Sequence, residues 1–219
     1  MPVSKKLRPA PLFSQGFTIL ELMIAASVFS IILLVVAVGV LNFTNSYFKG
    51  ITTSKTQDAA RSVMNTLTQS IQFGQTVTLP TYNSSADTWG MCIDNTLYAF
   101  RLGQQVTDTA PQPGINQGYH GLVASSGCTL PASLPTTQTL NNGRELLGEH
   151  MRLNTLSVTQ SGNLYTIHVR IISGDNDLLT PNVTGSTDWA TTTETCSGSA
   201  GTQFCAVADL TTTVEKRLL

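Results

Sequence analysis

The N-terminal part of the chain changes abruptly from polar to apolar. Residues 1–15 are polar and basic and contain prolines at positions 2, 9 and 11, so no helix is expected there. The stretch from Leu22 to Leu41 then carries no charged residue. A helix of about twenty residues spans about 30 Å, the thickness of a hydrocarbon core, and satisfies its own backbone there. The pattern predicts a transmembrane or filament-core helix over residues 17–41, in which Gly39 is the candidate position for local melting.

The helical pattern continues past residue 41 with a different composition. Apolar residues now recur every three or four positions, which predicts an amphipathic continuation of the helix over residues 42–74. These positions are Ile51, Ala59, Ala60, Val63, Met64, Leu67 and Ile71. Gly74 is the expected end of the helix. A break into two helices at residues 52–54, Thr-Thr-Ser, is the alternative.

Downstream of Leu79, short β-type runs alternate with turn residues. Residues 89–101 predict two strands joined by a turn at Asp94-Asn95. Residues 111–148 are rich in Pro and Gly and are expected to form long surface loops. Residues 207–214 predict a last strand.

The clearest β-hairpin is predicted from residues 153–159 and 164–172, which flank a Ser-Gly-Asn turn. Alternate residues of the second strand are apolar, so one face is expected in the core and the other in solvent. The core set is Tyr165, Ile167, Val169 and Ile171, and the solvent set is Thr166, His168 and Arg170. These patterns predict an α+β fold, in which a long N-terminal helical spine packs on an antiparallel β-sheet head formed by residues 75–219.

Charge adds an orientation to this picture. Charged residues make up only 11% of the chain and the formal net charge is -1, which argues against nucleic-acid binding. The basic cluster Lys5, Lys6 and Arg8 precedes the apolar run. Cations on that side predict a cytoplasmic N-terminus and a head on the outer side of the membrane.

The four cysteines predict disulfides rather than a metal site. Cys92, Cys128, Cys196 and Cys205 form no CxxC pair, and no His stands at zinc-finger spacing from them. A secreted head lies in an oxidising compartment, where disulfides persist. Three pairings are possible. The order of the residues favours Cys92–Cys128 and Cys196–Cys205, because each pair closes a local loop.

Glu21 interrupts the apolar pattern near its start. A carboxylate costs about 2.5–3.5 kcal/mol at the bilayer centre and less near the interface, so it requires a partner or must reach the cytoplasmic interface. The run from Gly16 to Met23, GFTILELM, with a basic leader before it and an apolar helix after it, resembles the class III signal of type IV prepilins and pseudopilins. This resemblance rests on about the first 40 residues.

The resemblance implies how the chain is processed and assembled. A prepilin peptidase/methyltransferase would remove the basic leader, residues 1–16, by cutting between Gly16 and Phe17, and would methylate the new amine of Phe17. Glu21 of one subunit would neutralise the Phe17 amine of its neighbour. The implied partners are other pilin subunits and an inner-membrane assembly platform. The precursor would be a single-pass inner-membrane protein, and the assembled form an extracellular filament.

The resemblance also implies a structural role. Residues 60–67, together with the ending Val214–Arg217, resemble PilW-type minor pilins and J-type pseudopilins. The expected function is a minor pilin or pseudopilin of a type IV pilus, or of a related type II secretion or competence filament. A major pilin, or a tip adhesin whose loops bind a surface ligand, is the alternative.

The head carries no recognisable catalytic, cofactor or metal motif. The histidines His120, His150 and His168 belong to no such pattern, and His168 is expected to be an ordinary surface residue. Residues 174–177, Gly-Asp-Asn-Asp, offer clustered oxygens but lack the later Gly and Glu of a calcium loop, so a solvated turn is expected. The sequence therefore predicts neither an enzyme nor a cofactor.

Overall fold

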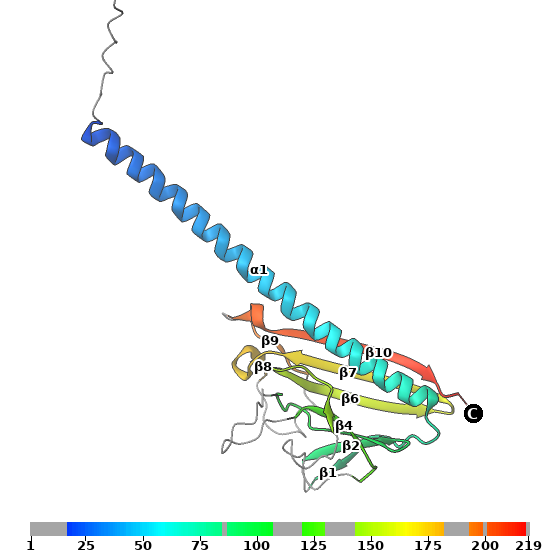
Figure 1. Ribbon diagram of the computed structural model, residues 1–219. Helices are drawn as coiled ribbons and strands as arrows, with labels where there is room; N and C mark the ends of the chain where they lie inside the picture. Colours follow the sequence, from blue (N-terminus) through cyan, green and yellow to red (C-terminus); the bar gives the residue numbers. More distant parts are fainter. Residues whose placement is uncertain are drawn as a thin grey trace, which may run out of the picture. The chain divides into compact units, whose positions relative to one another are not determined.

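The computed structural model describes residues 17–84, 87–106, 120–129, 143–181, 193–198 and 201–217. The chain divides into two compact units, Met1–Thr44 and Asn45–Leu219, which we describe separately. One helix, α1, spans Ile19–Phe73, and the strands of the second unit form two larger antiparallel sheets and one small one (Figure 1). The fold is thus α+β, as the sequence predicts.

In the first unit, α1 is apolar, and no described residue covers it. Its large apolar side chains from Ile19 to Leu41 are all at least half exposed. The hydroxyl groups of Ser30 and Thr44 donate hydrogen bonds to the carbonyl oxygens four residues earlier, so these polar groups need no external partner. Gly39 lies within the helix, and a Cβ added there would meet no atom within 4 Å. The helix is therefore regular at the position where melting was considered.

In the second unit, α1 buries a single stripe. The buried residues follow the predicted spacing and include Thr56 besides the apolar set Ala60, Val63, Met64, Leu67 and Ile71. The helix runs without interruption through residues 52–54, so the alternative of two helices is wrong. Here too, the Thr52 hydroxyl donates to the carbonyl oxygen of Phe48 at 3.0 Å. The Thr52 hydroxyl is thus satisfied within the helix by a bond to the preceding turn.

The helix ends at Phe73, and Gly74 lets the backbone that follows lie close to both the last helical turn and Ile93. A Cβ at residue 74 would lie 2.6 Å from the carbonyl oxygen of Ser70 and 2.8 Å from Cγ2 of Ile93. Only glycine fits between the last turn of α1 and the sheet. The Tyr98 and Ser70 hydroxyl groups, 2.8 Å apart, form a second link between this end of the helix and the same sheet.

The first larger sheet has the strand order β1-β2-β3-β4-β5, with every pair antiparallel. Its strands are β1 (Thr81–Asn83), β2 (Thr88–Ile93), β3 (Thr96–Phe100), β4 (Leu122–Ser126) and β5 (Arg144–Glu145). The β2–β3 turn falls at Asp94-Asn95, as predicted. Asp94 adopts φ 53°, a left-handed conformation that Asp and Asn tolerate better than most residues.

The second larger sheet has the order β10-β7-β6 and contains the predicted hairpin. Its strands are β6 (Met151–Ser161), β7 (Leu164–Ser173) and β10 (Ala206–Glu215). The predicted core set of β7 is buried, with Ile167, Val169 and Ile171 at 0% exposure. A small sheet pairs β8 (Leu179–Thr180) with β9 (Thr195–Cys196), and two 3-10 turns, η1 (Asn176–Leu178) and η2 (Thr202–Phe204), flank it.

The expectation that residues 111–148 form only loops is wrong. This range contains β4 and β5, and β4 pairs with β3 along its whole length, from Leu122 opposite Phe100 to Ser126 opposite Thr96. A strand of five residues between Gly121 and Gly127 has too few alternating positions to stand out against the surrounding turn signals. The tertiary pairing with β3 decides its structure. Residues 111–119 and 130–142 lie outside the described residues.

The head has one continuous apolar core. It joins the buried stripe of α1 to residues from both larger sheets, among them Phe100, Leu122, Leu153 and Ile171. In Figure 1 the C-terminal half of α1 runs along the sheet of β10, β7 and β6. The amphipathic half of the helix is therefore an integral part of the head.

Candidate functional site

The N-terminal end of α1 is built around a capping arrangement. The backbone N–H of Glu21 donates to Oγ1 of Thr18 at 3.2 Å, and the Leu22 N–H donates to the Thr18 carbonyl oxygen at 3.1 Å. Thr18 is thus the N-cap and Glu21 the third helical residue, the spacing of a capping box. A carboxylate in the first turn also opposes the positive end of the helix dipole. Sequence reasoning missed Thr18, although Thr-x-x-Glu before an apolar run is the relevant signal.

The residues at the proposed cleavage point precede the helix. Phe17 lies two positions before Ile19, outside regular secondary structure, and is 82% exposed. Gly16 lies outside the described residues. Among the described residues, α1 is the one helix that is long and apolar enough to cross a membrane, judged by length and composition alone. No side chain in its apolar window is buried.

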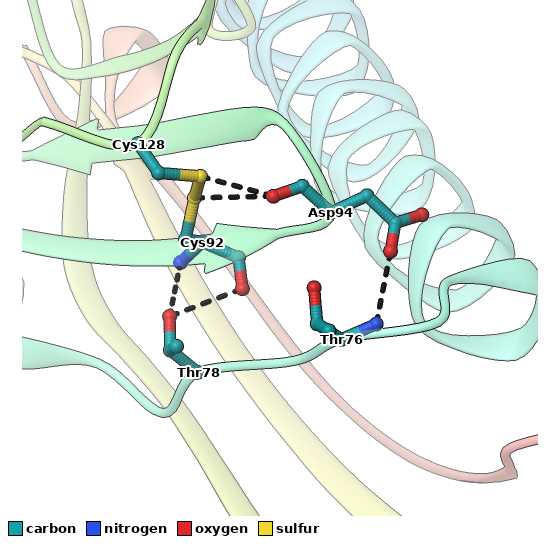
Figure 2. Close-up of a disulfide and its surroundings, with 5 residues drawn as sticks. All are labelled: Thr76, Thr78, Cys92, Asp94 and Cys128. Atoms are coloured by element: carbon teal, nitrogen blue, oxygen red, sulfur yellow. Dashed lines mark hydrogen bonds between the residues drawn. A yellow bond between two sulfur atoms is a disulfide. The ribbon is translucent and has the colours of Figure 1, made fainter.

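The first disulfide, Cys92–Cys128, lies beside the exit of α1 (Figure 2). Oγ1 of Thr78 accepts the Cys92 N–H at 2.7 Å and also donates to the Cys92 carbonyl oxygen at 3.1 Å. The Asp94 carbonyl oxygen lies 3.0 Å from Sγ of Cys128. The disulfide therefore joins β2 to the segment after β4 and borders the β2–β3 turn.

Asp94 ties this turn to the residues that follow α1. Its Oδ1 accepts the backbone N–H groups of Gln75 at 2.7 Å and Thr76 at 2.9 Å. The hydrogen bond from Thr76 is the largest of several causes that lower the pKa of Asp94, and the charge of Lys216 adds to it. Figure 2 shows Asp94 between the disulfide and Thr76.

The second disulfide, Cys196–Cys205, joins β9 to the start of β10, with a Cα–Cα distance of 5.7 Å. The loop that it closes carries Phe204, whose ring lies 5.6 Å from that of Phe48 on α1 and is 49% exposed. Gly174 has φ 133°, and a Cβ added there would lie 3.3 Å from Cβ of Cys205. Both disulfides are the pairs that the order of the cysteines favours.

A buried polar network that the sequence did not reveal connects β6 with the residue just before β9. Arg152, Asn154 and Glu194 are at most 1% exposed. Nδ2 of Asn154 donates to Oε2 of Glu194 at 2.9 Å, and Asn154 sits at the irregularity between Leu153 and Thr155 in β6. Burial raises the pKa of Glu194 to about 7, against the opposing charges of Arg152 and Arg170. Nothing in the local pattern around Glu194, in a Thr-rich run, marked it as buried.

Arg152 binds the turn that was considered as a calcium loop. Its Nη2 donates to the Gly174 carbonyl oxygen at 2.6 Å and its Nη1 to Oδ1 of Asn176. Two oxygen atoms of that turn thus accept hydrogen bonds from a buried arginine. Within the described part of the chain, no group of three or more His, Cys, Asp or Glu residues could hold a metal ion.

The histidines lie in separate places. His168 lies on the solvent face of β7 as predicted, but its Nε2 is 2.7 Å from Oδ1 of Asp209, and Nη1 of Arg170 donates to Oδ2 of that carboxylate at 2.6 Å. Burial raises the pKa of Asp209, but these two partners outweigh it and lower the pKa below its usual value. His150 is 64% exposed. His168 is therefore partnered, unlike the plain surface residue expected.

Glu145 holds together the segments around β4 and β5. Its carboxylate accepts four backbone N–H groups, those of Gly121, Leu122, Leu146 and Leu147, at 2.9 to 3.1 Å. Nδ1 of His120 lies 3.2 Å from Oε2. Both oxygens of this carboxylate accept hydrogen bonds from the backbone, so its role in the described structure is to hold these segments in place.

Comparison with known protein families finds a match at the N-terminal end of the chain. Residues 13–37 match the prokaryotic N-terminal methylation motif. No curated protein and no solved structure matches the chain. The motif covers the residues from which the sequence predicts processing and membrane insertion, and together with the apolar helix it fits a membrane-anchored precursor. It implies processing by a prepilin peptidase and assembly with other pilins. The N-terminal segment therefore carries the methylation motif of the prepilin and pseudopilin class, which supports a type IV pilin-like filament subunit.

Proposed function

We propose that the chain is a minor pilin or pseudopilin of a type IV pilus, or of a related secretion or competence filament. The observation that carries the proposal is the methylation motif at residues 13–37 on a helix whose apolar half is wholly exposed. Such a surface requires a bilayer or neighbouring helices around it. The long segments between the strands of the head favour a specialised subunit over an abundant one.

Processing between Gly16 and Phe17 agrees with the local structure. Phe17 is exposed and precedes the first helical residue, so the described side of the bond lies outside the regular helix. Cleavage there creates a cationic amine on Phe17, four residues before Glu21. Methylation leaves that amine basic.

Glu21 is the proposed charge partner of this amine in a neighbouring subunit. A buried charge without its partner costs several kcal/mol, so the pair would set the axial register of the filament even if its net stabilisation is small. Thr18 caps the helix at Glu21 and so fixes the turn that carries the carboxylate. Glu21 lies in the first unit and the head in the second. A substitution at Glu21 should therefore impair assembly without altering the structure of the head.

Peptide mass spectrometry of sheared surface filaments and of washed membranes tests the proposal. An N-methylated peptide beginning at Phe17 in the sheared fraction identifies a filament subunit, and its abundance relative to other subunits separates minor from major pilin. The same peptide confined to membranes identifies a pseudopilin or priming subunit. An uncut chain, or one cut after Leu41, would refute the prepilin assignment.

Variants separate processing from assembly. Gly16→Ala should leave the leader attached and the filament unassembled. Glu21→Gln should be cleaved normally yet enter filaments poorly, whereas Thr18→Val, which removes the cap but keeps the carboxylate, should be cleaved and assembled. Equal incorporation of the Glu21→Gln and wild-type chains would exclude the charge pair.

A further inference from the structure

A cleft of about 310 Å³ opens on the head between β6 and the first larger sheet. One wall consists of Leu79 and Pro80, which precede β1, with Trp89 of β2 and Leu102, which follows β3. The other wall is Thr155–Val158 of β6. All of these residues belong to the second unit, so the cleft is a feature of the head alone.

The cleft abuts the main-chain edge of β6. Neighbouring side chains of a strand point to opposite faces, yet four consecutive residues line this one cavity. Leu156 is buried in the core at 5% exposure, whereas Ser157 is exposed. A cavity in contact with both faces must lie along the edge between them. β6 is the outer strand of its sheet, on the side toward β1 and β2 (Figure 1).

Only the first half of that edge has main-chain partners within the described residues. The N–H of Gly103 donates to the Leu153 carbonyl oxygen, and the N–H of Val106 donates to that of Met151, both at 2.8 Å. Beyond the irregularity at residues 153–155, no described segment forms backbone hydrogen bonds with the outer edge. The described residues therefore leave a row of backbone donors and acceptors facing the cleft from Thr155 onward.

This edge lacks the usual protection. Exposed edges are normally protected by a charged residue or proline, and residues 155–161, TLSVTQS, contain neither. The walls of the cleft are also uncharged. Nε1 of Trp89 is buried and has no hydrogen-bond partner within the described part of the chain.

We propose that the edge of β6 accepts an extended, uncharged peptide strand of a partner protein. Main-chain hydrogen bonds to residues 155–161 would supply affinity, and one apolar side chain of the peptide would enter the cleft beside Trp89. The absence of charge on both edge and walls selects an uncharged segment over a charged one. This site lies in the head and does not depend on filament assembly.

Amide hydrogen exchange on the full chain in lipid nanodiscs tests the site. The probe is the blocked heptapeptide acetyl-TVTLTVT-amide at 1 mM, and the control is acetyl-TVPLTPT-amide, whose prolines remove N–H groups from both sides of the strand. The first peptide should slow exchange across residues 155–161 at least about tenfold, and the second should not. Equal protection by both peptides, or protection by neither, overturns the proposal.

Variants locate the contact. Ser157→Lys, which places a charge on the edge, should weaken binding at least about tenfold. Thr213→Lys, at an exposed position of β10 in the same sheet, is the matched control and should bind like wild type. Trp89→Phe keeps a ring but removes part of the apolar wall of the cleft, and should weaken binding about fivefold. Binding of octanoate that excludes the peptide without protecting residues 155–161 would identify a cleft for small apolar molecules and refute strand addition.

Discussion

The buried carboxyl group of Glu194 makes the stability of the head depend on pH. The side chain has 0% exposure, its Oε2 accepts one hydrogen bond from Asn154, and its pKa is raised from 4.5 to about 7. The folded state thus holds a proton that the unfolded chain releases. Between about pH 4.5 and pH 7 the free energy of unfolding should fall with rising pH, and above pH 7 the loss is complete.

The magnitude follows from the shift. Each pKa unit corresponds to about 1.4 kcal/mol, so a change from 4.5 to about 7 corresponds to about 3 kcal/mol. Glu194→Gln removes the ionisation and keeps an oxygen that can accept the Asn154 bond. At pH 8 the variant should therefore be more stable than wild type by most of that amount, which is about 5–10 °C in Tm for a domain of this size. At pH 5 the two should differ by less than about 1 kcal/mol.

Thermal unfolding of the full chain in detergent, followed by near-UV circular dichroism at pH 5 and pH 8, measures the difference. Glu149→Gln is the matched control, because that side chain is 53% exposed and should change neither transition. A Glu194→Gln variant whose shift in Tm is the same at both pH values would refute the reasoning from burial. A variant destabilised at pH 8 would mean that the two arginines nearby stabilise the carboxylate more than burial disfavours it.

Three further predictions concern stability. Glu145→Gln leaves backbone N–H groups without a charged acceptor. It should lower the free energy of unfolding, measured by urea titration, by about 3 kcal/mol. Asp94→Asn should lower Tm at pH 7 but not below the folded pKa of Asp94, because a lowered pKa stabilises only the ionised form. Replacing Cys92 and Cys128 by Ser should lower the free energy of unfolding by about 4 kcal/mol, because that disulfide closes a loop of 36 residues. Replacing the second pair should lower it by about 3 kcal/mol, because that loop spans 9 residues. Equal losses would contradict the loop-entropy account.

The sequence predicted those elements that have a long hydrophobic pattern or a turn formed by characteristic residues. The α1 stripe, the hairpin of β6 and β7 and the β2–β3 turn at Asp94 follow from periodicity and turn chemistry, and the structure agrees with them. β4 and β5 were not predictable, because strands of five and two residues depend on pairing with a distant strand. The buried Arg152 and Glu194 were missed for a related reason, since their burial depends on elements that the local sequence does not contain.

The exit of α1 is tied to both larger sheets. Asp94 binds Gln75 and Thr76 from the β2–β3 turn, and the first disulfide braces that turn. From the residues that follow β10 of the other sheet, Nζ of Lys216 donates to the Gln75 carbonyl oxygen at 2.5 Å, and the Arg217 N–H donates to that of Gln72 at 3.1 Å. Both larger sheets therefore converge on one short segment. In a filament subunit, tension along the second half of α1 would reach both sheets together, so the head should resist force as one body.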